Sequence, residues 1–118
     1  MDDFITKDSG ERRQFDTGAQ RDDRKGKLRF SLVPHKPLER LMKRYLEGAE
    51  TYGENNWKKG MHYSIYYDSA MRHLTSFWQG KKSEDHLAAA AWNIFALMHH
   101  EDTKIDALAL DDRDNNPN

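Results

Sequence analysis

Cysteine is absent from this sequence of 118 residues, which excludes disulfide bonds and thiolate metal sites such as zinc fingers. No apolar run approaches the roughly 20 residues of a membrane span. The first residues also lack the basic and apolar regions of a signal peptide. Because the formal net charge is only −1, nothing favours general binding to nucleic acid or to an anionic membrane. We therefore expect a cytoplasmic protein whose partners include neither nucleic acid nor membrane.

Hydrophobic residues are also scarce, at 36% against 33% charged residues. A chain of this length forms one domain at most, and its buried surface must be small. The segment Leu87–Met98 is nevertheless apolar nearly all round a helix, so it should be central rather than peripheral. We expect subunits to share a core, in a homodimer or a homotetramer.

Residues 1–27 form a polar arm that is dominated by charged residues, Gly, Ser and Gln. Left alone, such a segment buries too little apolar surface to offset its chain entropy, so we expect no fixed structure. Basic residues collect just before the first apolar patch, and they include Lys27 and Arg29. The arm is either a solvated extension or a segment that folds over the domain and brings cations to an anionic ligand.

A helical domain is expected over residues 28–110, followed by a disordered acidic tail over residues 111–118. Pro37 suits the first turn of a helix that runs to about Tyr52 and stops at Gly53. A second helix is predicted over residues 64–79. Their apolar positions follow helical spacing, with Leu38, Leu41, Met42, Tyr45, Leu46 and Ala49 in the first helix and Ile65, Tyr66, Ala70, Met71, Leu74, Phe77 and Trp78 in the second.

Ser83 can cap a third helix, with Glu84 and Asp85 in its first turn, where negative charge is favourable. No strand pattern stands out. The sequence therefore predicts an all-α protein, a small helical bundle with a polar N-terminal arm.

Acidic residues fall on all three predicted helices, in a pattern that favours a site for a hard divalent cation. Glu47 and Glu50 are three residues apart and share one helix face. Asp68 lies among apolar residues of the second helix, and a carboxylate in that setting needs a partner. The alternative is that these are solvated charges, that Asp68 pairs with Arg72, and that Asp85 is only a helix-terminal charge.

Other polar side chains lie beside apolar ones and are candidates for contacts with substrate. His73 and His86 could donate a hydrogen bond or move a proton, although core histidines with satisfied hydrogen bonds are an alternative. Asn93 needs a hydrogen-bonding partner on another helix or on a ligand. Asn56 and Trp57 could contact a base, with Trp57 alternatively anchoring its loop to the core.

The run His99-His100-Glu101-Asp102 is similar to the ligands of HD phosphohydrolases. The adjacent His-Asp order of those enzymes is missing, and a fourth ligand has no obvious source. We discount this interpretation.

Three motifs in combination resemble the phage dATP/dGTP diphosphohydrolase family. They are Gly48-Ala49-x-x-Tyr52-Gly53-x-x-Asn56-Trp57-x-x-Gly60, Asp68-Ser-Ala-x-Arg72-His73-Leu74 and Glu84-Asp85-His86-Leu-Ala-Ala-Ala-x-Trp92-Asn93. The run Gly18-x-x-Arg21-Asp22 through Gly26-Lys27-x-Arg29-Phe-x-Leu32-x-Pro34 fits the N-terminal pattern of that family. The resemblance covers residues 9–101.

The resemblance implies an all-α fold related to the MazG-like nucleotide pyrophosphohydrolases. It also implies cleavage of a purine deoxynucleoside triphosphate between the α- and β-phosphates, with Mg²⁺ or Mn²⁺, in phage purine nucleotide metabolism. Glu47-x-x-Glu50 matches the first half of the MazG-like carboxylate motif, whereas the second half has no direct counterpart. A second histidine found in some relatives is replaced by Ala89.

The sequence therefore predicts a metal-dependent dGTP or dATP pyrophosphohydrolase. The predicted metal ligands are Glu47, Glu50, Asp68, Glu84 and Asp85, and the predicted catalytic residues are Glu50, as proton acceptor, and His86. The predicted substrate-binding residues are Lys27, Arg29, Asn56, Trp57, Arg72, His73 and Asn93. Two alternatives remain, a non-catalytic interaction module and a protein that senses dNTPs without hydrolysing them.

Overall fold

The computed structural model describes residues 8–103 and 109–114, and most of these are helical. The predicted helical fold class is confirmed, with a small two-stranded sheet in addition. Contacts along the chain separate an N-terminal unit, Met1–Val33, from a helical unit, Pro34–Asn118. The sequence prediction instead began the helical domain at residue 28. None of the helices in the described ranges is both long and apolar enough to cross a bilayer.

A β-hairpin forms in the arm, where we predicted no strand. Strand β1 (Arg12–Gln14) pairs in antiparallel fashion with β2 (Gln20–Asp22). The connecting turn is closed by backbone hydrogen bonds between Phe15 and Ala19 and between Gly18 and Phe15. Gly18 has a φ of 88°, which glycine adopts at little steric cost. The strands are polar and have no apolar alternation, so the pattern on which strand prediction depends is missing.

The first two helices begin and end close to the predicted positions. Helix α1 spans His35–Tyr52 and ends at Gly53, whose φ is 94°. Pro37 lies in its first turn, where a missing N–H costs nothing. The short 3₁₀ helix η1 (Phe30–Leu32) precedes α1, and η2 (Asn56–Lys59) follows it.

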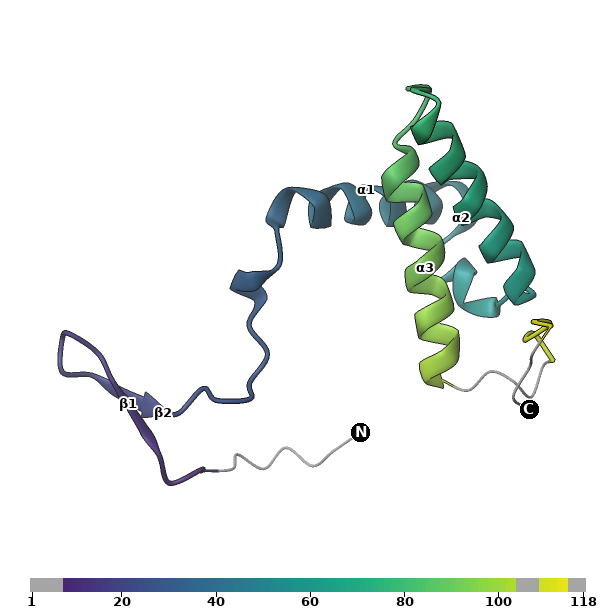
Figure 1. Ribbon diagram of the computed structural model, residues 1–118. Helices are drawn as coiled ribbons and strands as arrows, with labels where there is room; N and C mark the ends of the chain where they lie inside the picture. The colour runs from purple at the N-terminus through teal and green to yellow at the C-terminus, as the bar shows by residue number, and fades with distance from the viewer. Residues whose placement is uncertain (1–7, 104–108, 115–118) are drawn as a thin grey trace. The chain divides into compact units, whose positions relative to one another are not determined.

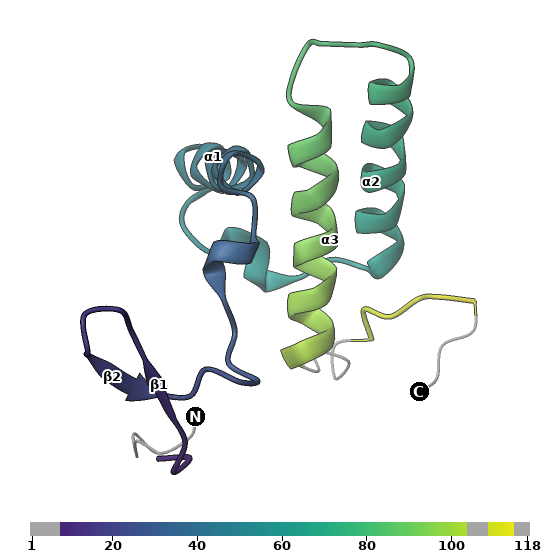
Figure 2. The ribbon, with the colours of Figure 1, turned by 60° about the vertical axis from the view of Figure 1, so that its left-hand side comes forward.

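Helices α2 (Tyr63–Trp78) and α3 (His86–Thr103) form an antiparallel pair, and α1 runs across this pair (Figures 1 and 2). Helix α3 packs against both α1 and α2. The predicted central position of α3 is therefore confirmed, for the reason expected from its apolar composition.

The core is small, and much of it consists of alanine side chains on α3. Its buried apolar residues are Leu41, Tyr63, Tyr66, Ala70, Ala88, Ala89, Ala90 and Ala96. Most of the large apolar residues that follow helical spacing in the first two predicted helices are exposed, among them Met42, Leu46, Ile65, Met71, Leu74, Phe77 and Trp78. The helices were placed correctly, but one chain has too few elements to cover their apolar faces.

The N-terminus of α3 is capped by Asp85, not by Ser83 as predicted. The Asp85 carboxylate accepts a hydrogen bond from the backbone N–H of Ala88 at 3.1 Å, and its backbone carbonyl accepts one from Ala89. The helix consequently begins at His86. Of the predicted acidic tail, residues 115–118 lie outside the described residues. Asp112 accepts hydrogen bonds from the backbone N–H and the hydroxyl of Ser64, at the start of α2.

Candidate functional site

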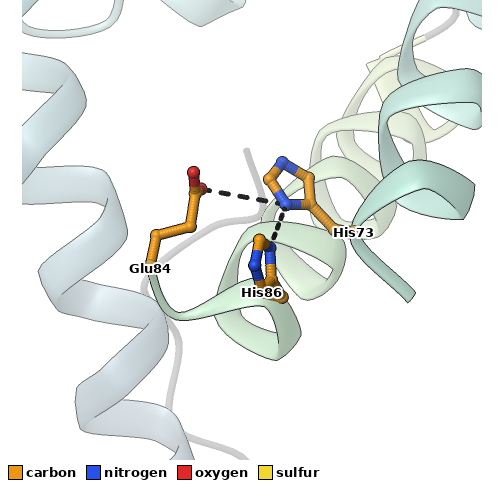
Figure 3. Close-up of side chains that lie close together, drawn as sticks. All are labelled: His73, Glu84 and His86. Atoms are coloured by element: carbon orange, nitrogen blue, oxygen red, sulfur yellow. Dashed lines mark hydrogen bonds and ion pairs between the residues drawn. The ribbon is translucent and has the colours of Figure 1, made fainter. Parts of the chain in front are cut away.

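Two histidines and a glutamate come together where the chain turns from α2 into α3. His73 is on α2, Glu84 is in the turn, and His86 is the first residue of α3 (Figure 3). The Nδ1 atoms of His73 and His86 are 3.0 Å apart, and Oε1 of Glu84 is 3.8 Å from His73 Nδ1. In the described part of the chain, no other group of three or more His, Asp or Glu side chains is arranged to hold a metal ion.

The turn brings these residues together because it reverses the chain within a few residues. Gly80, with a φ of 76°, ends α2, and Asp85 caps α3, so His86 returns beside the last turns of α2. His86 is 8% exposed, and its Nε2 is buried with no hydrogen-bond partner. An orphaned buried polar atom costs free energy, so its retention needs an explanation.

Burial keeps His73 in its neutral form at neutral pH. It lowers the pKa of His73 below the usual 6.5, although the nearby Glu84 carboxylate acts in the opposite direction. A neutral imidazole keeps one nitrogen lone pair. The shared hydrogen bond fixes the orientation of both rings. The pair can therefore accept a proton or bind a cation.

Two arginines of α1, which the sequence analysis missed, contact the acidic residues of the turn. Arg44 lies 3.4 Å from Glu84 and 3.5 Å from Glu47, so it links these two predicted metal ligands. Arg40 binds both carboxylate oxygens of Asp85, at 2.7 and 2.6 Å. This bidentate contact is the main cause of the Asp85 pKa, which is lowered to about 2. A spacing of four residues on one helix face was the available signal for this arginine pair.

A cavity of about 320 Å³ opens next to the cluster of His73, Glu84 and His86. Its lining residues are Arg40, Phe77, Gly80, Lys81, Lys82, Glu84, Asp85, His86 and Leu87. Three of these side chains carry positive charge, from Arg40 and two turn lysines. The volume lies at the lower end of small-molecule sites. Lys81 and Lys82 are new candidates for contact with an anionic ligand.

Asp68 and Arg72 lie elsewhere on α2. Both line a second open cavity of about 470 Å³, whose other lining residues are Met71, Thr75, Ser76, Gln79 and Lys81. Asp68 is not part of the cluster, and in the described part of the chain it makes no ion pair with Arg72. Lys81 borders both cavities.

The comparisons with known proteins identify the family. A family model described as "dATP/dGTP diphosphohydrolase, N-terminal" matches residues 17–113. The chain belongs to this family. No curated protein and no solved structure matches the chain. The matched region includes β2, all three α-helices and every residue of the cluster.

In this member of the dATP/dGTP diphosphohydrolase family, other predicted site residues lie apart from the cluster. Glu50 is exposed on α1 and does not belong to the group of His73, Glu84 and His86. Trp57, on η2, packs edge-on against Tyr45 and His99, with ring centroids at 5.7 and 4.8 Å. These contacts fit a loop anchor. The predicted base contact by Asn56 and Trp57 stays a prediction.

Asn93 finds its hydrogen-bonding partners inside the protein. Its buried amide donates to the hydroxyl of Ser69 on α2 at 3.1 Å and to the backbone carbonyl of Ala89 at 2.9 Å. It therefore joins α3 to α2, one of the two possibilities that the sequence left open. Its contact with substrate stays a prediction.

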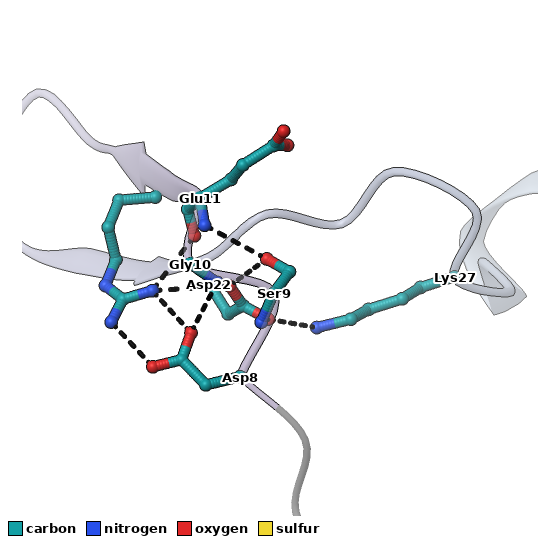
Figure 4. Close-up of polar contacts among 7 residues, drawn as sticks. Asp8, Ser9, Gly10, Glu11, Asp22 and Lys27 are labelled. Atoms are coloured by element: carbon teal, nitrogen blue, oxygen red, sulfur yellow. Dashed lines mark hydrogen bonds and ion pairs between the residues drawn. The ribbon is translucent and has the colours of Figure 1, made fainter.

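Lys27 and Arg29 belong to the N-terminal unit. Lys27 lies 3.5 Å from Asp22, which also accepts hydrogen bonds from the backbone and the hydroxyl of Ser9 (Figure 4). Asp22 also lies 3.4 Å from Arg12, which binds Asp8. Arg29 immediately precedes η1. Both predicted phosphate ligands fall inside the family match, and their contact with phosphate remains a prediction.

Proposed function

We propose that this protein hydrolyses dGTP or dATP to the corresponding monophosphate and pyrophosphate. Water attacks the α-phosphorus, and the bond from that phosphorus to the oxygen bridging to the β-phosphate breaks. The water loses its protons to the protein and the solvent, and pyrophosphate leaves. The family match over residues 17–113 carries this proposal, because it spans nearly the whole helical unit. From the resemblance, we place the reaction in phage purine nucleotide metabolism, in the host cytoplasm.

The cluster beside the 320 Å³ cavity supports a location for the reaction. A triphosphate needs positive charge around it, and Arg40, Lys81 and Lys82 line this cavity. Groups that can take a proton lie at its edge, namely Glu84 and His86. A water molecule held between the cavity and the imidazole pair would lie within reach of both.

Mg²⁺ or Mn²⁺ is the metal that the resemblance implies, and the turn offers donors for it. Glu84 supplies carboxylate oxygens, Glu47 shares its Arg44 partner, and the buried Nε2 of His86 has no hydrogen-bond partner. When bound, a divalent ion neutralises phosphate charge and lowers the pKa of attacking water. We propose Glu84 and Glu47 as its oxygen ligands. Glu50, Asp68 and Asp85 stay predicted ligands, and Asp85 would first have to leave Arg40.

The remaining roles follow the charge and position of each side chain. His86, whose ring is held by His73, stays the catalytic residue that the sequence predicts. Glu50 stays the proton acceptor that the sequence predicts, and Glu84 is the rival that the geometry favours. Arg72, Lys27 and Arg29 are proposed phosphate ligands.

A second copy of the chain would cover the exposed apolar surface of the helical unit. On α2 the exposed residues Tyr67, Met71, Leu74 and Trp78 are spaced four, three and four residues apart, as in a helix–helix seam. On α3, Leu87, Ala91, Ile94 and Met98 repeat this spacing, and the last two are exposed. We propose that these two stripes pack against the same stripes of another copy, giving a homodimer or, by further pairing, a homotetramer.

The test is incubation of the full chain with each dNTP and with Mg²⁺ or Mn²⁺, followed by separation of the products. We expect monophosphate and pyrophosphate from dGTP and dATP, and little product from dCTP and dTTP. A chelator should stop the reaction. Release of tripolyphosphate would indicate a different chemistry. Binding of dNTP without turnover would indicate a nucleotide sensor and not an enzyme.

A further inference from the structure

Two imidazoles and one carboxylate form an unusual donor set for an enzyme expected to use Mg²⁺. Mg²⁺ prefers oxygen ligands in octahedral geometry, whereas imidazole nitrogen is a good ligand for Zn²⁺, Co²⁺ and Fe²⁺. Some catalytic zinc sites use this donor set, with two histidines, one glutamate and an open fourth position for water. The turn of this chain offers the three protein donors.

We propose that His73, Glu84 and His86 bind one first-row transition-metal ion and that the site selects this class of ion over Mg²⁺. Of the two ions in the proposed function, this selectivity leaves Mn²⁺, which belongs to the class. Glu84 would provide one carboxylate oxygen, and each histidine one ring nitrogen. The site lies at the edge of the 320 Å³ cavity, from which water can complete the coordination.

The spacing of the donors is the first support. The Nδ1 atoms of His73 and His86 are 3.0 Å apart. Two nitrogen ligands of one tetrahedral ion lie about 3.3 Å apart when each metal–nitrogen bond is about 2.0 Å. The hydrogen-bonded pair is therefore within a few tenths of an ångström of ligand spacing. An ion can replace the shared proton once each ring turns so that its lone pair points at the ion.

Glu84 can complete the site because it is free to move. Its carboxylate lies 3.8 Å from His73 Nδ1, and its side chain is 42% exposed. Arg44, at 3.4 Å, would have to give up Glu84, and it keeps Glu47 as a partner. The site thus exchanges one exposed ion pair, which contributes little to stability, for a metal–carboxylate bond.

The burial of His86 is the second support. Its ring is 8% exposed and lies at the edge of a cavity, so its orientation is fixed before an ion binds.

Metal binding is measured on the chelator-treated full chain by calorimetry, with Zn²⁺ alone and then with Mg²⁺ alone. No nucleotide is present, so the result does not depend on whether the protein hydrolyses dNTPs. We expect one equivalent of Zn²⁺ to bind and excess Mg²⁺ to leave its affinity unchanged. Equal competition by Mg²⁺ would overturn the proposed selectivity.

Substitutions of the proposed ligands test which side chains bind the ion. Glu84→Gln and His73→Gln should each weaken Zn²⁺ binding at least about tenfold. Glu84 is exposed, so its substitution leaves the fold intact, and circular dichroism checks both variants. Glu54→Gln and His35→Gln are the matched controls, an exposed carboxylate and an exposed imidazole outside the cluster, and they should bind as the parent does. Unchanged binding by Glu84→Gln would end the proposal.

Imidazole ¹⁵N spectra give a readout that a merely structural role would not change. Zn²⁺ is diamagnetic, so ring nitrogens that bind it shift without broadening. We expect the ring signals of His73 and His86 to shift with one equivalent, and those of the other four histidines to stay. Shifts at His35, His62 or His99 instead would place the ion elsewhere.

Discussion

Glu84 and Glu50 are both exposed glutamates, but they have different neighbours. Glu84 contacts Arg44 and lies near His73, at the edge of a cavity lined by cations. Glu50 lies outside that group. A carboxylate beside an imidazole and a cavity can bind metal or move a proton, and Glu50 has neither neighbour in that group. The geometry therefore favours Glu84 where the sequence favoured Glu50.

We predict that Glu84→Gln lowers kcat for dGTP by about a hundredfold or more, the size of a lost acid–base or metal-binding group. From the sequence, Glu50→Gln should also abolish turnover without loss of fold. Steady-state kinetics on both variants, with exposed Glu54→Gln as control, measure this. Full activity in Glu50→Gln would remove that residue from the mechanism, and full activity in Glu84→Gln would separate the cluster from catalysis.

His100 is fully buried and hydrogen-bonds through Nε2 to the hydroxyl of Tyr66, at 2.9 Å. Burial lowers its pKa below 6.5, with a smaller contribution from His99. The unfolded chain therefore binds a proton more readily than the folded chain. The free energy of unfolding is largest above the unfolded pKa of 6.5 and falls as the pH drops from there towards the lowered folded pKa.

We predict that the urea midpoint falls on acidification through this window and that His100→Gln flattens the dependence. Glutamine can keep a hydrogen bond to Tyr66, and it does not titrate. Urea unfolding across the window, with exposed His35→Gln as control, gives the comparison. An unchanged slope in His100→Gln would assign the pH dependence to other groups.

The start of α3 depends on one side chain with two functions. Asp85 caps the helix through Ala88 and ties it to α1 through Arg40. The cap satisfies an N–H that the helix leaves free, and the arginine contact fixes how α1 crosses α3. The orientation of the neighbouring His86 follows from both contacts.

Asp85→Asn and Asp85→Ala separate these two functions. Asparagine keeps the cap and loses the charge, whereas alanine loses both, so we predict Asp85→Ala to be less stable by about 1 kcal/mol. The Asp85 pKa is lowered from 3.8 to about 2. The stabilisation from Arg40 is therefore present above 3.8 and lost as the pH falls towards 2. Denaturant midpoints measure both effects, and equal stability of the two variants would contradict the capping role.

As a single copy, the chain leaves many apolar side chains exposed. Trp78 is 87% exposed, Tyr67 61% and Met98 53%, whereas much of the buried core consists of alanines. Monomeric proteins rarely expose extended apolar surface of this kind. The stripes on α2 and α3 therefore fit a subunit interface.

We predict that Leu74→Glu, in the α2 stripe, converts the oligomer to a monomer. A buried charge without a partner costs several kcal/mol at an interface, once in each copy. Light scattering coupled to size exclusion measures the mass. Thr75→Glu adds the same charge next to the stripe and should remain oligomeric. A parent protein that is monomeric by light scattering would contradict the shared core.

Helix positions and the central place of α3 could be predicted because their signals are local. Apolar spacing, Pro37 and Gly53 each act within a few residues. The hairpin of the arm was missed because its polar strands lack alternation and are held by backbone hydrogen bonds. The prediction of Ser83 as the cap was wrong because Asp85 makes two stabilising contacts at this position. Its carboxylate accepts the hydrogen bond from the Ala88 N–H and also binds Arg40.

The candidate site needed the three-dimensional arrangement. Residue types pointed to Glu84, His73 and His86, but not to their meeting as one group. His73 and His86 are 13 residues apart, and Arg40 and Asp85 are 45 apart. Sequence spacing gives the direction of a side chain only along its own helix. Which side chains meet depends on the turn between α2 and α3 and on the crossing of α1, and both are set by packing between distant parts of the chain.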